Sequence, residues 1–186
     1  VDLAELKTFL QRRSPSHPWD TPRKEVDYPQ FISGMSAEGI LDGSPLTAEL
    51  SNANVRPQDY AATKLVPRPG HADFSAWAKW GDSYTQTGGG HFSARLTAPL
   101  CIAGGIALQI LRAQGISIAA HVLKIKDIND TPFELVDNSL EANKQLALQM
   151  DQLLQADPQA LPFLDAQAGE KTRVLLTQLR SEKNTV

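Results

Sequence analysis

Apolar positions follow a helical period in four segments of the chain. In the first segment, Leu3, Leu6 and Leu10 fall on one face, and Asp2 and Glu5 have the spacing of a capping box. The segments that this pattern predicts to be helical are residues 2–13, 98–111, 139–156 and 168–183. The second of them consists of small and apolar residues and ends near a glycine, so we expect a buried helix with a glycine stop.

Shorter segments with other patterns indicate strands. Residues 30–35 and 45–50 flank two glycine-containing turn dipeptides and predict a hairpin-like pair of strands. Residues 116–125 are rich in β-branched side chains and predict a further strand. The strands and helices alternate without βαβ regularity, and the sequence therefore predicts the α+β class.

The middle of the chain is dominated by turn signals. Residues 51–73 contain several asparagines and prolines that indicate irregular backbone. Phe74, Trp77 and Trp80 follow at a spacing that suits one face of a short helix, and we interpret the tryptophans as core or subunit-contact residues. The length allows one sizeable core, so residues 1–186 are predicted to form a single domain.

Charge and composition narrow the function classes. Eighteen basic and 21 acidic side chains give a formal charge of -3, so neither nucleic-acid nor membrane-surface binding is expected and any anion site must be local. The most apolar run, residues 98–111, is shorter than the roughly 20 residues that span a bilayer. The single Cys101 lies in this run and is interpreted as a packing residue. The four histidines lack zinc-ligand spacing, so no metal is expected.

Three segments could carry chemistry, and the first two contain glycine. Gly88-Gly89-Gly90 runs into a long helix, where backbone N–H groups could approach a phosphate, but the segment lacks the lysine and hydroxyl residue of a phosphate loop. Taken alone, it is better read as a flexible surface loop. His71 lies between a Pro-Gly turn and Asp73, which could orient it for proton exchange. Its residues alone favour a structural histidine in a loop.

A third segment contains paired basic residues. Arg12-Arg13 ends the first predicted helix, and Arg23-Lys24 ends a proline-rich loop over residues 14–24. Guanidinium groups suit a multiply charged small acid. The negative end of the helix dipole explains the same placement of Arg12 and Arg13 equally well.

Together and in order, these segments resemble the chorismate synthases, and the likeness covers nearly the whole chain. The stretches that carry it are Arg12-Arg13-Ser14-Pro15, Thr21-Pro22-Arg23-Lys24-Glu25, Ile32-Ser33-Gly34, Asn52, Arg56, Asp59-Tyr60, Arg68-Pro69-Gly70-His71-Ala72-Asp73, residues 88–97, Ala119-Ala120-His121-Val122 and Ala168-Gly169-Glu170-Lys171. The resemblance implies an α+β fold of layered helices and antiparallel sheets, incomplete over this span. It also implies a cytoplasmic homo-oligomer, a tetramer.

The resemblance further implies a reaction. Chorismate synthases convert 5-enolpyruvylshikimate 3-phosphate to chorismate and phosphate by an anti-1,4-elimination that needs reduced FMN as cofactor. On this basis His71 matches a catalytic acid–base histidine. The basic positions expected to bind substrate are Arg12, Arg13, Arg68 and Arg95, and the stretch expected to contact FMN comprises His91, Phe92, Ser93 and Ala94.

Departures from the family pattern set limits on these expectations. Ser14 stands where many members have an arginine, the loop at His17-Pro18-Trp19 lacks another basic residue, and His91 also replaces an arginine. The family's first catalytic histidine would precede Val1, and its late catalytic aspartate would follow Val186. We therefore expect a central fragment that is inactive alone. A non-catalytic flavin- or anion-binding remnant and a purely structural piece are the alternatives.

Overall fold

A computed structural model describes residues 1–20, 27–51, 58, 66–81, 84, 90–134 and 139–184. It divides the chain into two compact units, which are described separately. Unit 1 comprises residues 1–11 and 25–107, and unit 2 comprises residues 12–24 and 108–186. Five α-helices and two small antiparallel sheets among the described residues give the predicted α+β class. That residues 1–186 form a single domain stays a prediction.

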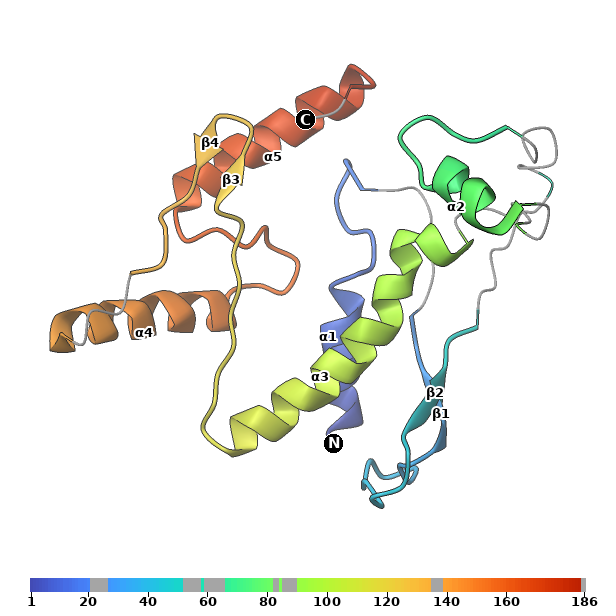
Figure 1. Ribbon diagram of the computed structural model, residues 1–186. Coiled ribbons are helices and arrows are strands. Elements are labelled where there is room, and N and C mark those ends of the chain that lie inside the picture. Colours follow the sequence, from blue (N-terminus) through green and yellow to red (C-terminus); the bar gives the residue numbers. More distant parts are fainter. Residues whose placement is uncertain are drawn as a thin grey trace. The chain divides into compact units, whose positions relative to one another are not determined.

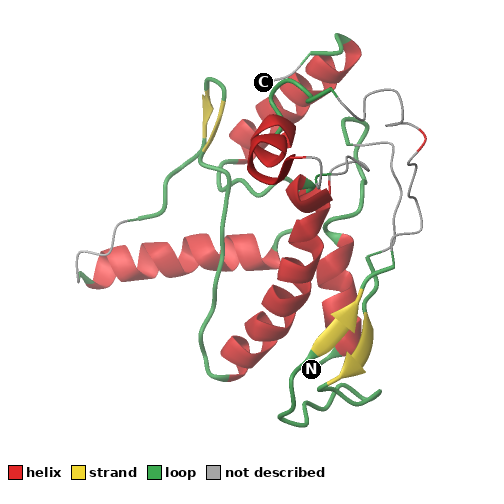
Figure 2. Cartoon of the chain, turned by 45° about the vertical axis from the view of Figure 1, so that its right-hand side comes forward, coloured by secondary structure: helices red, strands yellow, loops and turns green. Residues whose placement is uncertain are grey.

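The core of unit 1 lies between two helices that run side by side (Figures 1 and 2). Helix α1 (Leu3–Gln11) contributes Leu6 and Leu10, and helix α3 (Thr97–Ala113) contributes Ile102 and Ile106. Burial of each such side chain contributes about 1.5–3 kcal/mol. Cys101 is partly buried against this cluster, which agrees with the packing role expected of it.

The start of α1 and the end of α3 form as their sequences predict, whereas α1 ends at Gln11, two residues before the predicted end. At the start of α1, Asp2 Oδ1 accepts hydrogen bonds from the backbone N–H groups of Ala4 and Glu5 at 2.8 and 2.9 Å. Gly115, at φ +76°, follows the C-terminal end of α3. The expectation that α3 is buried was wrong for its outer face, where Leu100 is 71% exposed. Only the side that meets α1 belongs to the core.

The predicted hairpin is present in unit 1. Strand β1 (Gln30–Ser33) pairs antiparallel with β2 (Thr47–Glu49), with Phe31 opposite Ala48 and a bulge before Ser33. Gly34 follows at φ +82°, and a Cβ there would lie 2.5 Å from the Cα of Leu46. This position therefore requires glycine.

Helix α2 (Asp73–Trp80) confirms the short helix predicted from the aromatic spacing. Its aromatic side chains are not core residues of this chain, because Trp77 and Trp80 are 53% and 44% exposed. The residues buried in α2 are Asp73 and Ala76. The buried side of α2 thus carries a carboxylate and a small side chain rather than the aromatic rings.

In unit 2, the strand predicted over residues 116–125 is wrong except at its end. Strand β3 (Lys124–Ile125) pairs with β4 (Ile128–Asn129), and within the described part of the chain residues 116–123 pair with no strand. Ile118 and Leu123 in that segment are each 54% exposed. β-Branched side chains favour extended backbone, but a ladder forms only where a second strand supplies hydrogen-bond partners.

Two capped helices complete unit 2. Ser139 Oγ accepts from the N–H of Ala142 at the start of α4 (Leu140–Gln155), close to the prediction. Helix α5 (Ala166–Ser181) begins two residues earlier than predicted, because Asp165 caps it by accepting from Gln167 N–H at 2.8 Å. These caps fix where both helices begin.

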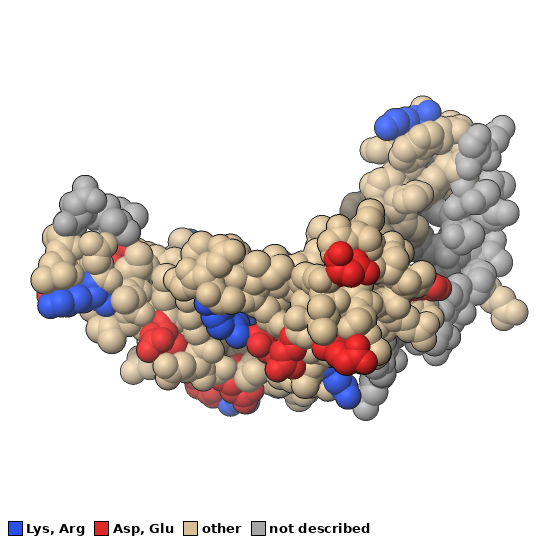
Figure 3. Space-filling model, turned by 90° about the horizontal axis from the view of Figure 1, so that it is seen from below, with Lys and Arg blue, Asp and Glu red and all other residues tan. Residues whose placement is uncertain are grey.

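The surface of the described residues carries both signs of charge, and acidic and basic side chains are interspersed on the face in Figure 3. By length and composition alone, the helical stretch over residues 94–113 could cross a membrane, with a mean hydropathy of 1.5. Core helices of globular proteins meet the same criterion, and α3 does pack on α1 through Ile102 and Ile106. Its apolar composition therefore assigns no membrane role.

Candidate functional site

The first cluster of candidate residues surrounds Asp73, the first residue of α2. Its carboxylate is 1% exposed, and His71 Nδ1 lies 2.6 Å from Oδ1. Arg68 donates to both oxygens, from Nε to Oδ2 at 2.6 Å and from Nη2 to Oδ1 at 2.9 Å. The turn from Arg68 to Gly70 makes this possible, because Gly70 takes a φ of +70° and brings both side chains back onto the helix start. Asp73 thus lies beside His71, as the sequence suggested.

The electrostatics of this cluster depend on the Asp73 carboxylate, which is buried and surrounded by hydrogen-bond donors. The Arg68 guanidinium, against the opposing effect of burial, holds the pKa of Asp73 well below its ordinary range. Asp73 is therefore an ionised acceptor at neutral pH. Since a carboxylate cannot donate, the contact at His71 Nδ1 requires a proton on that nitrogen. In the neutral imidazole, Nε2 is then the acceptor atom. Arg68 Nη2, which can only donate, lies 3.4 Å from Nε2 and 3.2 Å from Nδ1.

An aromatic cluster encloses one side of this carboxylate. Tyr84 donates its hydroxyl hydrogen to Asp73 Oδ1 at 3.1 Å, and its ring centroid lies 6.5 Å from Trp80 and 6.3 Å from Phe92. The edge of Phe92 also meets His71, at 6.2 Å between centroids and 88° between planes. The structure therefore brings together Arg68, His71 and Phe92, three of the predicted site residues.

The remaining residues of the predicted FMN stretch lie in two short turns, η3 (Gly90–Phe92) and η4 (Ala94–Leu96). His91 and Ala94 are exposed, whereas Ser93 is half-buried and accepts from Arg95 N–H at 3.2 Å. The turns lead directly into α3 and set the backbone direction at its start. Gly88 and Gly89, which the sequence analysis singled out, lie outside the described residues.

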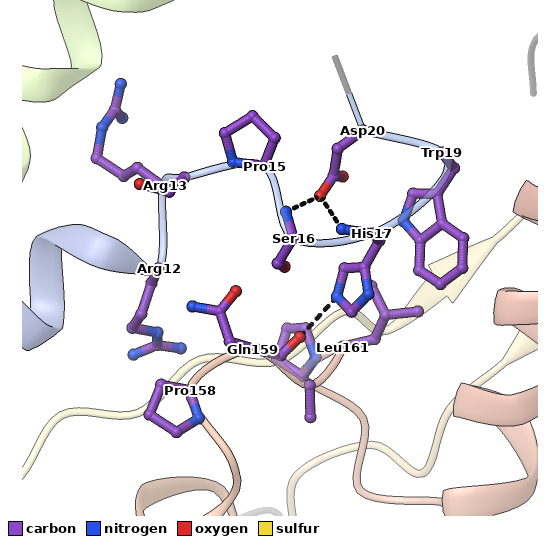
Figure 4. A pocket seen from close by; sticks show the side chains of 13 residues that line it. Arg12, Arg13, Pro15, Ser16, His17, Trp19, Asp20, Pro158, Gln159 and Leu161 are labelled. Carbon is purple, nitrogen blue, oxygen red and sulfur yellow. Dashed lines mark hydrogen bonds between the residues drawn. The ribbon is translucent and has the colours of Figure 1, made fainter. Parts of the chain in front are cut away.

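The predicted basic residues at the end of α1 line a pocket of unit 2. The pocket measures about 330 Å³ and is bounded by residues 12–17, 19, 20 and 158–162. Figure 4 shows the Arg12 side chain reaching toward Pro158 and Gln159, whereas Arg13 extends the other way. The two guanidiniums therefore do not act as one paired fork. The other predicted basic residues of this segment, Arg23 and Lys24, lie outside the described residues.

Local hydrogen bonds hold the loop that carries this pocket. Asp20 Oδ2 accepts from the N–H groups of Ser16 and His17, both at 2.8 Å. The His17 ring stacks on Trp19 at 4.5 Å, and Nε2 lies 2.7 Å from the Gln159 carbonyl oxygen. Because a carbonyl only accepts, Nε2 carries the proton in this contact. His17 thus fastens the loop to residues 158–162.

Sequence reasoning missed two contributors. Tyr84 lies in a glycine-rich stretch of sequence without periodicity, so no local pattern marks it as a partner of Asp73, which is eleven residues away. Asp130 belongs to no motif that the sequence pattern marks, yet it is 6% exposed and accepts from His121 Nδ1 at 2.7 Å. No group of three or more metal-ligating side chains occurs among the residues that the structure describes.

The fold and this site define an α+β chain in which an imidazole, a buried carboxylate and a guanidinium converge. A family model described as chorismate synthase matches residues 1–186. The chorismate synthase of Lancefieldella parvula is 86% identical over 186 residues, which are all of this chain and 49% of that protein. That of Aeropyrum pernix is 32% identical over all of this chain and 46% of its own length. The chain belongs to the chorismate synthase family.

The matches cover most or all of this chain but less than half of each relative. The chorismate synthase of Methanobrevibacter smithii is 36% identical over 146 residues, which cover 77% of this chain and 40% of that protein. The chain thus spans about half the length of the curated relatives it matches. The 186 residues therefore carry part of the sequence that those relatives use.

Proposed function

We propose that this chain contributes its part of a chorismate synthase active site, which converts 5-enolpyruvylshikimate 3-phosphate to chorismate and phosphate by a 1,4-elimination. The observation that carries the proposal is the family match over residues 1–186 together with 86% identity to a curated relative. The convergence of Arg68 and His71 on Asp73 supports it from the structure. Enzymes of this kind need a basic group and fixed positive charge beside the reacting atoms.

His71 is proposed to hold and release the proton at its Nε2 atom. Asp73 keeps Nδ1 protonated, so only Nε2 changes its protonation state during turnover. The ring is one-quarter exposed, which leaves it accessible from one side, while Asp73 behind it is buried. A general acid–base group placed in this way contributes about 10²–10⁴-fold to rate.

The substrate carries two carboxylates and a phosphate, and arginines are proposed to bind these groups. Arg68 is held rigid by its two bonds to Asp73, so its orientation is set before the substrate arrives. Arg95 follows Ser93 in the turn that leads into α3. Arg12 and Arg13 are proposed to bind anionic groups of the substrate through the pocket of unit 2.

Reduced FMN is the cofactor that family membership implies. His91, Phe92, Ser93 and Ala94 are proposed to contact it, and two observations fit: His91 and Ala94 are exposed, and Phe92 links the segment to His71. When bound, reduced FMN supplies electron density to the allylic system of the substrate. The half-buried Phe92 would exclude water from the side of His71 that it covers.

The assembly and location proposed for the complete protein are a cytoplasmic homotetramer. No metal, nucleic acid or membrane partner is part of the proposal. A small-molecule lyase reaction of this type needs none of them beyond its flavin. The 186-residue chain alone is proposed to be inactive, because the family's first catalytic histidine and its late aspartate are not among its residues.

The test is an anaerobic assay of chorismate formation from 5-enolpyruvylshikimate 3-phosphate with reduced FMN. The complete gene product, the 186-residue chain and the full-length Lancefieldella parvula relative, as positive control, are assayed side by side. We expect turnover by the complete product and none by the chain alone. A complete product that binds FMN saturably without turnover would instead be a flavin-binding remnant. Turnover by the chain alone would contradict its proposed inactivity.

A further inference from the structure

The Asp73 carboxylate accepts hydrogen bonds from several donors at once. Oδ2 receives the backbone N–H of Arg68 at 3.1 Å and its Nε at 2.6 Å. Oδ1 receives Arg68 Nη2, His71 Nδ1 and the Tyr84 hydroxyl. The first four contacts come from the turn just before α2. Tyr84 is the one donor among these that comes from the other side, after the helix.

Tyr84 is held where its hydroxyl must meet the carboxylate. Its ring packs beside Trp80, nearly parallel at an interplanar angle of 22°, and beside Phe92, at 53°. Phe92 and Trp80 also contact each other, with centroids 6.2 Å apart. Three mutually touching rings restrict the rotation of each one, so the phenol oxygen has little freedom to leave Asp73.

The protonation states make this contact directional. Burial, followed by the hydrogen bond to Asp73, raises the pKa of Tyr84, so the phenol keeps its proton. Asp73 is ionised and can only accept. The hydroxyl therefore always donates to Oδ1, the same oxygen that accepts from His71. A rotation of the carboxylate that broke the bond to His71 would also break the bond to Tyr84.

We propose that Tyr84 is a positioning residue: through Asp73 it fixes His71 as the Nδ1–H tautomer and so keeps Nε2 as the atom that exchanges protons. The inference rests on the proposed function for its effect on rate, but its effect on the tautomer does not. Phe92 contacts both Tyr84 and His71, so the segment proposed to contact FMN also packs against the residue that positions His71. Arg68 donates to both oxygens of the same carboxylate, and its Nη2 also lies 3.2 Å from His71 Nδ1 and 3.4 Å from Nε2.

The first measurement reads the tautomer directly. Long-range ¹H–¹⁵N correlation spectra of the 186-residue chain are recorded in mildly alkaline buffer for the wild type and for Tyr84→Phe, with the His71 signals assigned from His71→Gln. We expect the wild type to show Nδ1 protonated and Nε2 unprotonated, and Tyr84→Phe to show a mixture of both tautomers. Tyr28→Phe is the matched control, because Tyr28 is 51% exposed and lies outside the cluster. Circular dichroism checks that each variant is folded.

A second variant keeps the inference falsifiable if Tyr84→Phe disturbs the loop. Asp73→Leu removes every acceptor for the Nδ1 proton, and it should shift the tautomer at least as far as Tyr84→Phe does. A single Nδ1–H tautomer in a folded Tyr84→Phe chain, or in a folded Asp73→Leu chain, overturns the proposal whatever the activity.

Kinetics of the complete gene product then test the consequence. Because Tyr84 acts through His71, Tyr84→Phe should lower kcat about 3–10-fold with little change in KM. This loss is a small part of the roughly 10²–10⁴-fold that a general acid–base group contributes to rate. A mixed tautomer with unchanged kcat would uphold the positioning of His71 and refute its role in the reaction. Absence of turnover in the wild type would count against the proposed function alone.

Discussion

His121 Nδ1 lies 2.7 Å from Asp130 Oδ2, and both side chains are almost fully buried. The same carboxylate accepts from the backbone N–H groups of Leu164 and Asp165, at 2.8 and 2.7 Å. Asp130 therefore ties three segments of unit 2 together: the one before β3, the end of β4 and the start of α5. Asp165 is also the residue that caps α5, so the position of that helix depends on this contact.

Replacing Asp130 by asparagine should destabilise the chain by about 1–3 kcal/mol, because the amide can no longer accept from every donor and a buried donor is left unpaired. Urea unfolding followed by circular dichroism measures the effect. Asp127→Asn is the matched control: it makes the same chemical change at an exposed position of the β3–β4 turn and should stay within about 0.5 kcal/mol of wild type. Equal midpoints for the two variants would show that the Asp130 contacts contribute nothing.

The same contacts should make stability depend on pH. Burial alone would raise the pKa of Asp130, but the N–H groups of Leu164 and Asp165 and the His121 ring together lower it below its ordinary value of about 3.9. A lowered carboxyl pKa gives stability that is present above the unfolded-state value and is lost as pH falls through the folded-state value. The free energy of unfolding should therefore decrease as the pH is lowered below about 4.

Asp73 acts in the same direction, since Arg68 and its other donors also lower its pKa. Urea unfolding of the wild type and of Asp130→Asn at a series of pH values separates the contribution of Asp130 to the pH dependence of stability from that of Asp73. The variant should lose less stability than the wild type on acidification, because one of the two linked groups is gone. Parallel pH curves for the two proteins would argue against a lowered pKa at Asp130.

The loop that carries Arg12 and Arg13 offers a prediction about positioning in unit 2. His17 Nε2 donates to the Gln159 carbonyl, so His17→Ala should release the loop, and trypsin should cut after Arg12 or Arg13 several-fold faster. His17→Gln is the matched variant, because its amide nitrogen occupies nearly the place of Nε2 and can restore the bond. Mass spectrometry of timed digests follows cleavage. Identical rates for all three proteins would mean that the contact does not hold the loop.

The sequence predicted well those elements whose signals are local. The capping position of Asp2 and the cap of α4 each depend on residues within a few positions of one another. The hairpin of β1 and β2 was marked by the glycine-containing turns between its two strands. In the candidate site, the pairing of His71 with Asp73 was also within reach, because the two residues are close in sequence. Such features follow from backbone preferences that operate before the chain folds.

Features that depend on distant partners could not be predicted in this way. Residues 116–123 have the composition of a strand but lack a partner strand in the described part of the chain. Tyr84 reaches Asp73 only because three aromatic rings cluster, and Asp130 reaches Leu164 across 34 positions. In each case the deciding contact is tertiary and carries no periodicity. The exposure of Trp77 excludes its interpretation as a core residue, whereas the interpretation as a subunit-contact residue stays a prediction.

Packing between α1 and α3 yields the last prediction, which compares two neighbouring glycines. A Cβ on Gly105 would lie 2.6 Å from Leu6 Cδ1 and 2.8 Å from Phe9 Cδ1, whereas a Cβ on Gly104 would meet nothing within 4 Å. Alanine is favoured over glycine in a helix by about 1 kcal/mol at both positions. At Gly105 this gain is opposed by overpacking, which costs about 1–3 kcal/mol because Leu6 is almost fully buried and cannot move far.

Gly104→Ala should therefore raise the free energy of unfolding by about 0.5–1 kcal/mol, and Gly105→Ala should lower it by up to about 2 kcal/mol. Urea midpoints of the two single variants measure the difference, and helix propensity cancels between them. A third variant, Gly105→Ala with Leu6→Val, removes one methylene group from the contact and should recover part of the loss. If Gly105→Ala were as stable as Gly104→Ala, the close approach of α1 to α3 at this point would be refuted.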